Sequence, residues 1–283
     1  MLKQRVITAL LLLAGFIPAI FYHDPAPFCA LVLLLVVAGA WEWGRLNGYG
    51  QTMCVLGAVV CACLCLGVWW WGWLGQSLLA LWWPACLAWT IGGAWLLREG
   101  VAGWSVHDRR LRLIGGLLLL WLAWLAAAQA RVIGVNLLLS ILALSWAADI
   151  SAYFVGRTWG GRVVPVRLAP TISPGKTWEG VAGGVLGVLV VALLWRWVDS
   201  HWAIEVPSLY TRLGRWGAAG FVLALVLLTA MSVAGDLLES LVKRSAGVKD
   251  SSGLLPGHGG VLDRLDALLP TLPLALLVCT AWN

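Results

Sequence analysis

Long apolar runs restrict the fold of this chain more than any other feature of its sequence. An α-helix needs roughly 20 apolar residues to cross the core of a bilayer. Nine runs approach that length: Val6–Tyr22, Pro27–Trp43, Met53–Trp73, Leu78–Leu97, Leu113–Ala130, Val132–Val155, Glu179–Val198, Trp216–Leu241 and Leu265–Trp282. Only 11% of the 283 residues are charged, against about a quarter in a soluble domain. The sequence therefore predicts an all-α, polytopic transmembrane bundle of about nine helices. The short connections from the third run to the fourth and from the fifth to the sixth favour antiparallel hairpins.

The distribution of basic residues predicts the orientation of this bundle. With a cytoplasmic N-terminus, the positive-inside rule is obeyed by all but four of the 19 Lys and Arg residues, namely Arg131, Arg196, Arg212 and Arg215. The net charge of +6 is then a sign of membrane topology and no argument for nucleic acid. The polar loops 156–178 and 243–264 both face the cytoplasm, where nucleoside triphosphates are found. The loop 199–215 faces the other side, shows no motif and is assigned no chemistry.

Charged side chains are concentrated between Asp236 and Asp266. Asp236, Ser240 and Lys243 are four and then three residues apart, so they share one face of a helix. Asp263 and Asp266 share a face at the start of the last predicted helix. A carboxylate in a membrane helix is costly and is a candidate for function. Carboxylates from two helices that converge at a membrane surface suit a hard divalent cation such as Mg²⁺.

The residues between these carboxylates suit phosphate groups. Lys243-Arg244 and Lys249 supply cations. The run Pro256–Gly260 has little side-chain bulk, so the backbone N–H groups of the residues after its proline can approach a phosphate closely. Each part also has an ordinary explanation, because an aspartate often caps a helix, paired basic residues often anchor one at the membrane surface, and His258 can be a simple loop residue. Their joint occurrence within one short segment favours a site.

A second candidate is Lys176 in the segment Ser173–Gly180. Gly175-Lys176-Thr177 is like the end of a P-loop, but that motif requires glycine where Pro170 stands. An ordinary P-loop is therefore excluded. Lys176 remains a candidate for binding a phosphate of a nucleotide, with a simple membrane anchor as the alternative, and Glu179 is expected to be a first-turn acid.

Asp149 is the third candidate. With Ser145 and Tyr153 it forms a polar stripe on an apolar helix, so it is either functional or part of an interhelical hydrogen bond, and it is not assigned as a metal ligand. The small residues Gly180, Gly183, Gly184 and Gly187 predict close packing of the following helix.

The polar segment resembles a family signature. It reads Ser240-x-x-Lys243-Arg244-x4-Lys249-Asp250-x-Ser252-x-x-Leu255-Pro256-x-His258-Gly259-Gly260-x-x-Asp263-Arg264-x-Asp266, and it is similar to the signature of the phosphatidate cytidylyltransferases, or CDP-diacylglycerol synthases. The resemblance extends to Asp149-x-x-Ala152-Tyr153-x-x-Gly156-Arg157 and to Ser173–Gly180. It implies a homodimeric membrane enzyme that makes CDP-diacylglycerol and pyrophosphate from CTP and phosphatidate with Mg²⁺, and it implies that Asp236 and Asp263 are the metal ligands.

Roles for the remaining residues follow from this expectation. Phosphate or other substrate contacts are assigned to Lys176, Lys243, Arg244, Lys249, Gly259, Gly260 and Arg264. Catalytic or shaping roles are assigned to Lys176, Ser240, Lys243, Lys249, Asp250, His258 and Asp266. The catalytic region is then 131–283, and residues 1–130 hold transmembrane helices with little motif content. We expect an inner-membrane, multi-pass protein of phospholipid biosynthesis whose site faces the cytoplasm. The alternatives are a CTP-dependent lipid kinase and an ion-coupled transporter.

Overall fold

The structure is a computed structural model that describes residues 2–280, with the side chains of residues 4–280. Lys3, one of the basic residues placed in the cytoplasm, has its side chain outside this range, and so does Trp282 at the end of the ninth apolar run. The helices are α1 Leu2–Phe21, α2 Ala26–Leu46, α3 Gln51–Trp70, α4 Leu79–Leu87, α5 Gly93–Val106, α6 Arg109–Ile133, α7 Val135–Trp159, α8 Trp178–His201, α9 Leu209–Leu213, α10 Gly217–Ser245, α11 Leu262–Leu265 and α12 Leu268–Thr280. Short turns η1 Trp73–Gly75 and η3 Gly214–Trp216 and a π-helical segment η2 Ala88–Gly92 complete them. The predicted all-α fold is confirmed.

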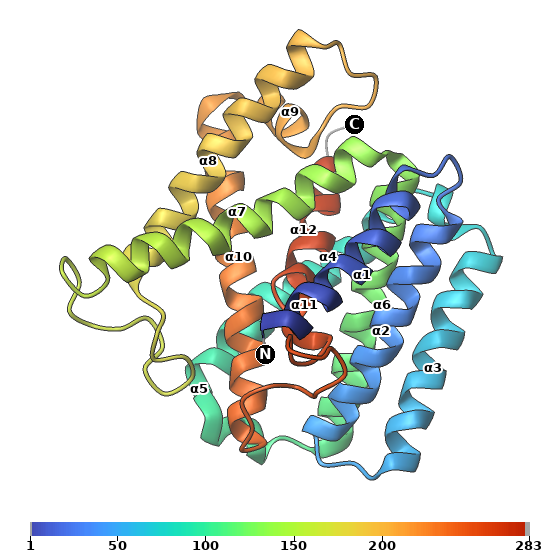
Figure 1. Cartoon of the computed structure of the whole chain (residues 1–283), viewed down its shortest axis with the longest axis vertical. Helices are drawn as coiled ribbons and strands as arrows, with labels where there is room; N and C mark the ends of the chain where they lie inside the picture. The colour runs from blue at the N-terminus through green and yellow to red at the C-terminus, as the bar shows by residue number, and fades with distance from the viewer. Residues whose placement is uncertain (1, 281–283) are drawn as a thin grey trace.

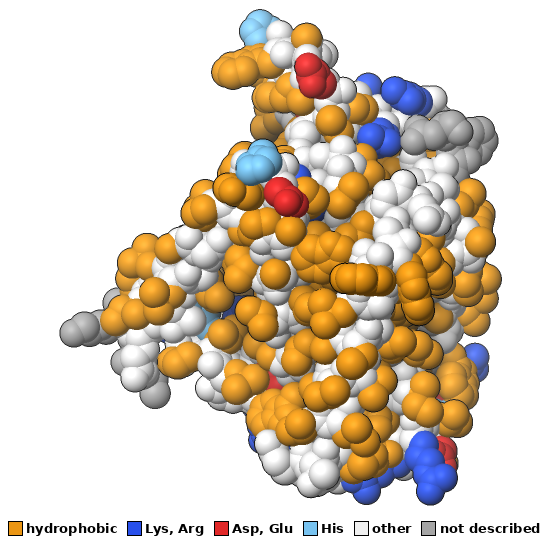
Figure 2. Space-filling model, turned by 90° about the vertical axis from the view of Figure 1, so that its right-hand side faces the viewer, with side chains coloured by type: hydrophobic (Ala, Val, Ile, Leu, Met, Phe, Trp, Pro, Cys, Tyr) orange, Lys and Arg blue, Asp and Glu red, His pale blue; other side chains and the backbone are white. Residues whose placement is uncertain are grey.

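Eight helical segments in the described part of the chain are long and apolar enough to cross a membrane. One of them joins α4, η2 and α5, and another joins α9, η3 and α10. The flank of the molecule in Figure 2 is covered by hydrophobic side chains, with Lys and Arg mainly near its two extremities. This is the surface expected of a multi-pass membrane protein, since lipid can cover side chains that water would not.

The ninth apolar run corresponds to α12, which differs from the other long helices in its surroundings. Its side chains are buried from Pro270 to Leu277, and it lies in the middle of the bundle against α4, α6 and α10 (Figure 1). A helix that is apolar on all sides is suited to such a position. The core is therefore built around the C-terminal helix, next to the segment that carries Asp263 and Asp266.

The helix pairs differ from the predicted hairpins. The third and fourth runs do not form a packed pair, because α3 packs mainly on α2 and α6, while α4 packs mainly on α12. Helix α7 leaves α6 at Gly134, runs obliquely across the bundle and packs mainly along α8 (Figure 1). A Cβ added at Gly184 would lie 3.1 Å from the carbonyl oxygen of Ala148, so the predicted close packing through small residues is confirmed for this pair.

The long helix α10 connects two polar regions. We call the first the charged end: the loop 160–177, the C-terminal part of α10 from Asp236 to Ser245, and the segment 246–266. Arg244 Nε of α10 donates to the carbonyl oxygen of Ile172 at 3.4 Å, which connects the loop 160–177 to the C-terminal turn of α10. The opposite end holds residues 199–216, at the start of α9 and α10 (Figure 1). The predicted site residues all belong to the charged end, apart from Asp149 further along α7.

Candidate active site

Lys176 and Asp236 join the α7–α8 loop to α10. The loop is closed by a hydrogen bond from Leu168 N to Lys176 O at 3.1 Å, and Lys176 Nζ lies 2.7 Å from Asp236 Oδ2. Ser240, one turn later on α10, donates its hydroxyl to Asp236 Oδ1 at 3.3 Å. Both side chains of the ion pair remain partly exposed. The structure therefore brings together three residues that the sequence assigned to the site.

A cavity of about 460 Å³ opens beside this pair. Lys176 and Asp236 line it together with Asp149, Tyr153 and Arg157 from α7. Arg157 Nη1 donates to the hydroxyl oxygen of Tyr153 at 2.6 Å. Asp149 thus shares a solvent-sized space with the charged residues, and the cavity combines two carboxylates with two cations.

Lys243 and Asp263 form the second charged group. Lys243 Nζ lies 2.6 Å from Asp263 Oδ1 and also contacts the buried carboxylate of Glu239 one turn earlier on α10. Asp263 Oδ2 accepts hydrogen bonds from Ser251 N at 3.0 Å and from Gly260 N at 2.7 Å, and the hydroxyl oxygen of Ser251 lies 3.1 Å away. Partial burial opposes ionisation of Asp263, but the hydrogen bonds from Lys243 and from the Gly260 N–H group, together with the charge of Lys243, outweigh it and lower the pKa of the carboxyl group. Asp263 is therefore held as a carboxylate.

The segment Leu255–Gly260 forms a tight loop over Asp263. Leu255 N donates to Gly259 O at 2.9 Å, and His258 N donates to Leu255 O at 2.8 Å. Gly257 and Gly259 have φ angles of 77° and 87°, a conformation that glycine adopts readily and other residues do not. Gly260 was predicted to bind substrate through its backbone, but in this structure its N–H donates to Asp263. This part of the loop therefore orients a carboxylate.

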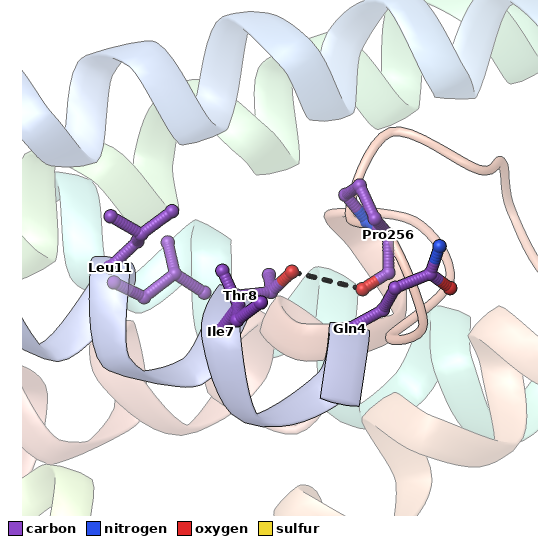
Figure 3. A pocket seen from close by; sticks show the side chains of 6 residues that line it. Gln4, Ile7, Thr8, Leu11 and Pro256 are labelled. Atoms are coloured by element: carbon purple, nitrogen blue, oxygen red, sulfur yellow. Dashed lines mark hydrogen bonds between the residues drawn. The ribbon is translucent and has the colours of Figure 1, made fainter. Parts of the chain in front are cut away.

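The first helix covers the same loop. Thr8 of α1 donates its hydroxyl to Pro256 O at 3.0 Å (Figure 3), and a Cβ added at Gly257 would lie 2.9 Å from the side chain of Arg5. Gln4, Ile7 and Leu11 line the shallow pocket between α1 and Pro256. The N-terminal helix therefore borders the segment that carries the family-like signature.

The remaining predicted residues surround these groups. Arg264 donates to His258 O, and Arg244 also donates to Val248 O at 3.4 Å. Lys249 and Asp250 are exposed on the loop after α10. Burial, and then the negative charge of Asp236, raise the pKa of Asp266 to about 7.

Glu42 is the functional candidate that sequence reasoning missed. It lies on α2 in the half of the chain that was assigned little motif content, and its side chain is 0% exposed. Its carboxylate accepts hydrogen bonds from Val261 N at 2.9 Å, Leu262 N at 2.8 Å, Ser251 Oγ at 3.0 Å and Ser252 Oγ. A signal was present, because Glu42 is an acidic residue inside the apolar run Pro27–Trp43.

The donor set at the charged end suits a hard cation. Asp236, Asp263 and Asp266 supply oxygen ligands of the kind that Mg²⁺ prefers, and the carboxylates of Asp236 and Asp263 have each drawn in a lysine ammonium group. In residues 4–280 no three His, Cys, Asp or Glu side chains are gathered as a metal cage. The chemistry of these residues therefore fits a cation. Lys176 and Lys243 lie beside the carboxylates that would bind it.

Comparison with known proteins finds a family and relatives that match over the whole chain. The model of the "Cytidylyltransferase family" matches residues 3–282. The chain is 40% identical to a phosphatidate cytidylyltransferase of Pseudomonas aeruginosa over 290 residues, which cover 100% of this chain and 99% of the relative. It is 34% identical to a phosphatidate cytidylyltransferase of Haemophilus influenzae over 301 residues, which cover 96% of each protein.

Proposed function

The chain belongs to the cytidylyltransferase family, and on this premise we propose that it transfers the cytidylyl group of CTP to phosphatidate. The products are CDP-diacylglycerol and pyrophosphate, which places the enzyme in phospholipid biosynthesis. The observation that carries the proposal is the pair of lysine–carboxylate contacts, Lys176–Asp236 and Lys243–Asp263, at one end of a membrane bundle. Neither the lipid kinase nor the transporter is supported by the family match or by the names of the full-length relatives.

The reaction brings two polyanions together, so its main difficulty is electrostatic. A phosphate oxygen of phosphatidate attacks the α-phosphorus of CTP, and the bond to the leaving pyrophosphate breaks. Because the nucleophile is already anionic, it needs no strong general base. Preorganised cations that stabilise developing negative charge are the main catalytic resource for such a step. The charged end supplies them on two loops and on α10.

Lys176 and Lys243 are the central cations in this proposal. Each contacts a carboxylate in the structure, and each carries three donors on a flexible stem. When the nucleotide and lipid phosphates enter, the ammonium groups turn from the carboxylates to the phosphate oxygens. Lys249 on the loop after α10 and Arg264 on α11 add positive charge near the same phosphates, while Ser240 keeps Asp236 in place.

Mg²⁺ would be held by Asp236 and Asp263, with Asp266 beside them. When bound, it supplies positive charge that polarises the phosphoryl group and neutralises the leaving pyrophosphate. The lysines and the metal are then complementary, because each carboxylate released by a lysine becomes free to bind the cation. The raised pKa of Asp266, caused by burial and by the charge of Asp236, supports a site that gains stability from a bound cation.

The lipid substrate also indicates how the enzyme lies in its membrane. Phosphatidate keeps its acyl tails in the bilayer, so its headgroup meets the charged end at the membrane surface. We place the protein in the cytoplasmic membrane with the charged end facing the cytoplasm, because most basic residues then lie inside and CTP is available there. A homodimer is proposed from the family resemblance.

Radiolabelled CTP tests the reaction directly. Purified protein is incubated with phosphatidate, Mg²⁺ and CTP labelled in the α-phosphate, and we expect the label in the lipid product and unlabelled pyrophosphate in solution. Label that stays in CDP would instead identify a lipid kinase. Asp263→Asn should lower kcat about 100-fold to 1,000-fold, as expected for the loss of one preorganised electrostatic group. Full activity of this variant would refute the metal assignment.

A further inference from the structure

Glu42 connects helix α2 to the segment 251–262 at the charged end. Burying a carboxylate without partners is very costly, so a fully buried glutamate in an apolar helix must be held by its surroundings. Four donors of the described residues do so: the hydroxyl groups of Ser251 and Ser252 and the N–H groups of Val261 and Leu262. All four donors belong to the segment 251–262, which lies in the C-terminal half of the chain and packs against α2.

The contacts of Glu42 lead directly to Asp263. The Ser251 hydroxyl group lies within hydrogen-bond distance of both carboxylates, at 3.0 Å from Glu42 Oε2 and 3.1 Å from Asp263 Oδ2. The N–H groups of Val261 and Leu262 immediately precede Asp263 at the start of α11. The direction of the Asp263 side chain is therefore set from two sides by groups that Glu42 holds.

The packing around this contact is tight at Gly260. A Cβ added at Gly260 would lie 2.6 Å from Glu42 Oε1 and 1.9 Å from Ser251 Oγ, far closer than atoms approach without displacement. The loop therefore fits around the carboxylate only with glycine at this position. Gly260 in turn donates its N–H to Asp263 Oδ2 at 2.7 Å.

We propose that Glu42 is a positioning residue of the active site, which fixes the segment 251–262 so that Asp263 and its partner Lys243 face the reacting phosphates. The role of Asp263 in this statement rests on the proposed function. Glu42 itself makes no contact with substrate. Its effect is on the rate of the chemical step, because misplacing a catalytic group by about 1 Å can cost about 100-fold in rate.

Glu42→Gln tests this role, and Asp199→Asn is the matched control. Asp199 is a buried carboxylate at the opposite end that also accepts hydrogen bonds from neutral donors, among them Ser208 N at 3.0 Å and Asn136 Nδ2 at 3.0 Å. Each substitution replaces one carboxylate oxygen by an amide group that cannot accept the same hydrogen bonds. Thermal unfolding, kcat and KM for CTP are measured for both, and hydrogen exchange is followed in the peptide that contains Val261 and Leu262.

We expect Glu42→Gln to lower kcat about 100-fold with a small change in the KM for CTP, to raise the Mg²⁺ concentration for half-maximal rate, and to speed exchange at residues 261 and 262. Asp199→Asn should lower the Tm comparably and leave kcat, Mg²⁺ dependence and this exchange unchanged. Wild-type kcat in Glu42→Gln, or unchanged exchange together with lost activity, would overturn the proposal. So would equal losses of kcat in the two variants, which would indicate destabilisation alone.

Two further measurements apply if the Glu42→Gln variant does not fold or the wild-type protein is inactive. If Glu42→Gln does not yield folded protein, Ser252→Ala removes one of the four donors and should lower kcat about tenfold, about half of the larger effect on a free-energy scale; wild-type kcat in Ser252→Ala would overturn the proposal. If the wild-type protein forms no CDP-diacylglycerol, the proposed function fails. The exchange measurement then still decides whether Glu42 holds the segment 251–262.

Discussion

Each polar end of the bundle contains a buried carboxylate that holds a loop in place, but the two ends differ in the contacts of their cations. At the opposite end, Asp199 accepts hydrogen bonds from Asn136, Ser208 and Thr211, and Trp195 Nε1 donates to Asn136 Oδ1 at 2.9 Å. At the charged end, Glu42 accepts hydrogen bonds from two serine hydroxyl groups and two backbone N–H groups. In both places a buried carboxylate holds a loop against the helices through uncharged donors. Such networks are strong when all of their members are satisfied.

Among the side chains of residues 4–280, lysines contact carboxylates only at the charged end. In the described residues, the ion pairs Lys176–Asp236 and Lys243–Asp263 lie there, whereas Arg196 near the opposite end packs over the ring of Phe221 at 4.9 Å. A lysine beside a carboxylate can exchange that partner for another anion, whereas a hydroxyl group in a closed network offers no charge to a substrate. The comparison separates residues that fix the fold from residues that can act on phosphates.

Lys243→Met should show this difference most strongly. The substitution leaves the carboxylates of Glu239 and Asp263 without their shared cation, and breaking a buried pair in this way costs about 3–5 kcal/mol. We expect a large fall in thermal stability together with loss of CDP-diacylglycerol synthesis. Unfolding in detergent and the labelled-CTP assay measure the two effects.

A double variant separates stability from catalysis. Lys243→Met combined with Glu239→Leu removes the uncompensated buried acid, so much of the stability should return while the activity stays lost. Recovery of activity with stability would show that Lys243 has only a structural role. Lys243 at the charged end would then only stabilise the fold, as the residues around Asp199 do at the opposite end.

The sequence identified the charged residues of the candidate site, but it did not predict which of them contact one another. Apolar length and positive charge are local properties, so the helical bundle and the polar segment 236–266 could be read directly. Lys176 and Asp236 are far apart in the chain, and their contact follows from the path of α7 and α8, which the residue pattern did not predict. The expected hairpins were wrong for the same reason, since the connection length does not determine which helix faces pack.

Glu42 and Asp199 show what a pattern search leaves out. Each is a single acidic residue near the end of an apolar helix, and neither belongs to a motif that could be read from spacing. Their donors come from another segment of the chain, so their importance appears only when that segment is folded against them. A buried acid in a membrane helix is nevertheless a signal by itself, and it applies equally to a residue that holds a loop and to one that binds a metal.

Lys176→Met should have a smaller and more selective effect than Lys243→Met. The Lys176–Asp236 pair is partly exposed, with side-chain exposures of 23% and 35%, and exposed pairs contribute about 1 kcal/mol or less to stability. We expect a nearly unchanged Tm and a fall in kcat/KM for CTP of about 100-fold, as for the loss of one electrostatic contact to the transferring group. Lys176→Arg serves as the charge-preserving control. A large fall in Tm without a change in kcat/KM would assign Lys176 to the fold.

Asp266→Asn should give the smallest effect, visible as a change with pH. Burial and the charge of Asp236 raise the pKa of Asp266 to about 7, from 3.8 for an unperturbed aspartate. Between these values the unfolded chain has released a proton that the folded protein keeps, so this group lowers stability as the pH rises toward 7. Asparagine removes that slope. In EDTA, the Tm of the variant relative to wild type should therefore increase from pH 5 to about pH 7 and then stay level. Asp199→Asn measured alongside corrects for the general effect of replacing a buried carboxylate. A difference between Asp266→Asn and wild type that is the same at pH 5 and pH 8 would mean that Asp266 is already ionised, and the carboxylates at the charged end would then repel one another less than the structure indicates.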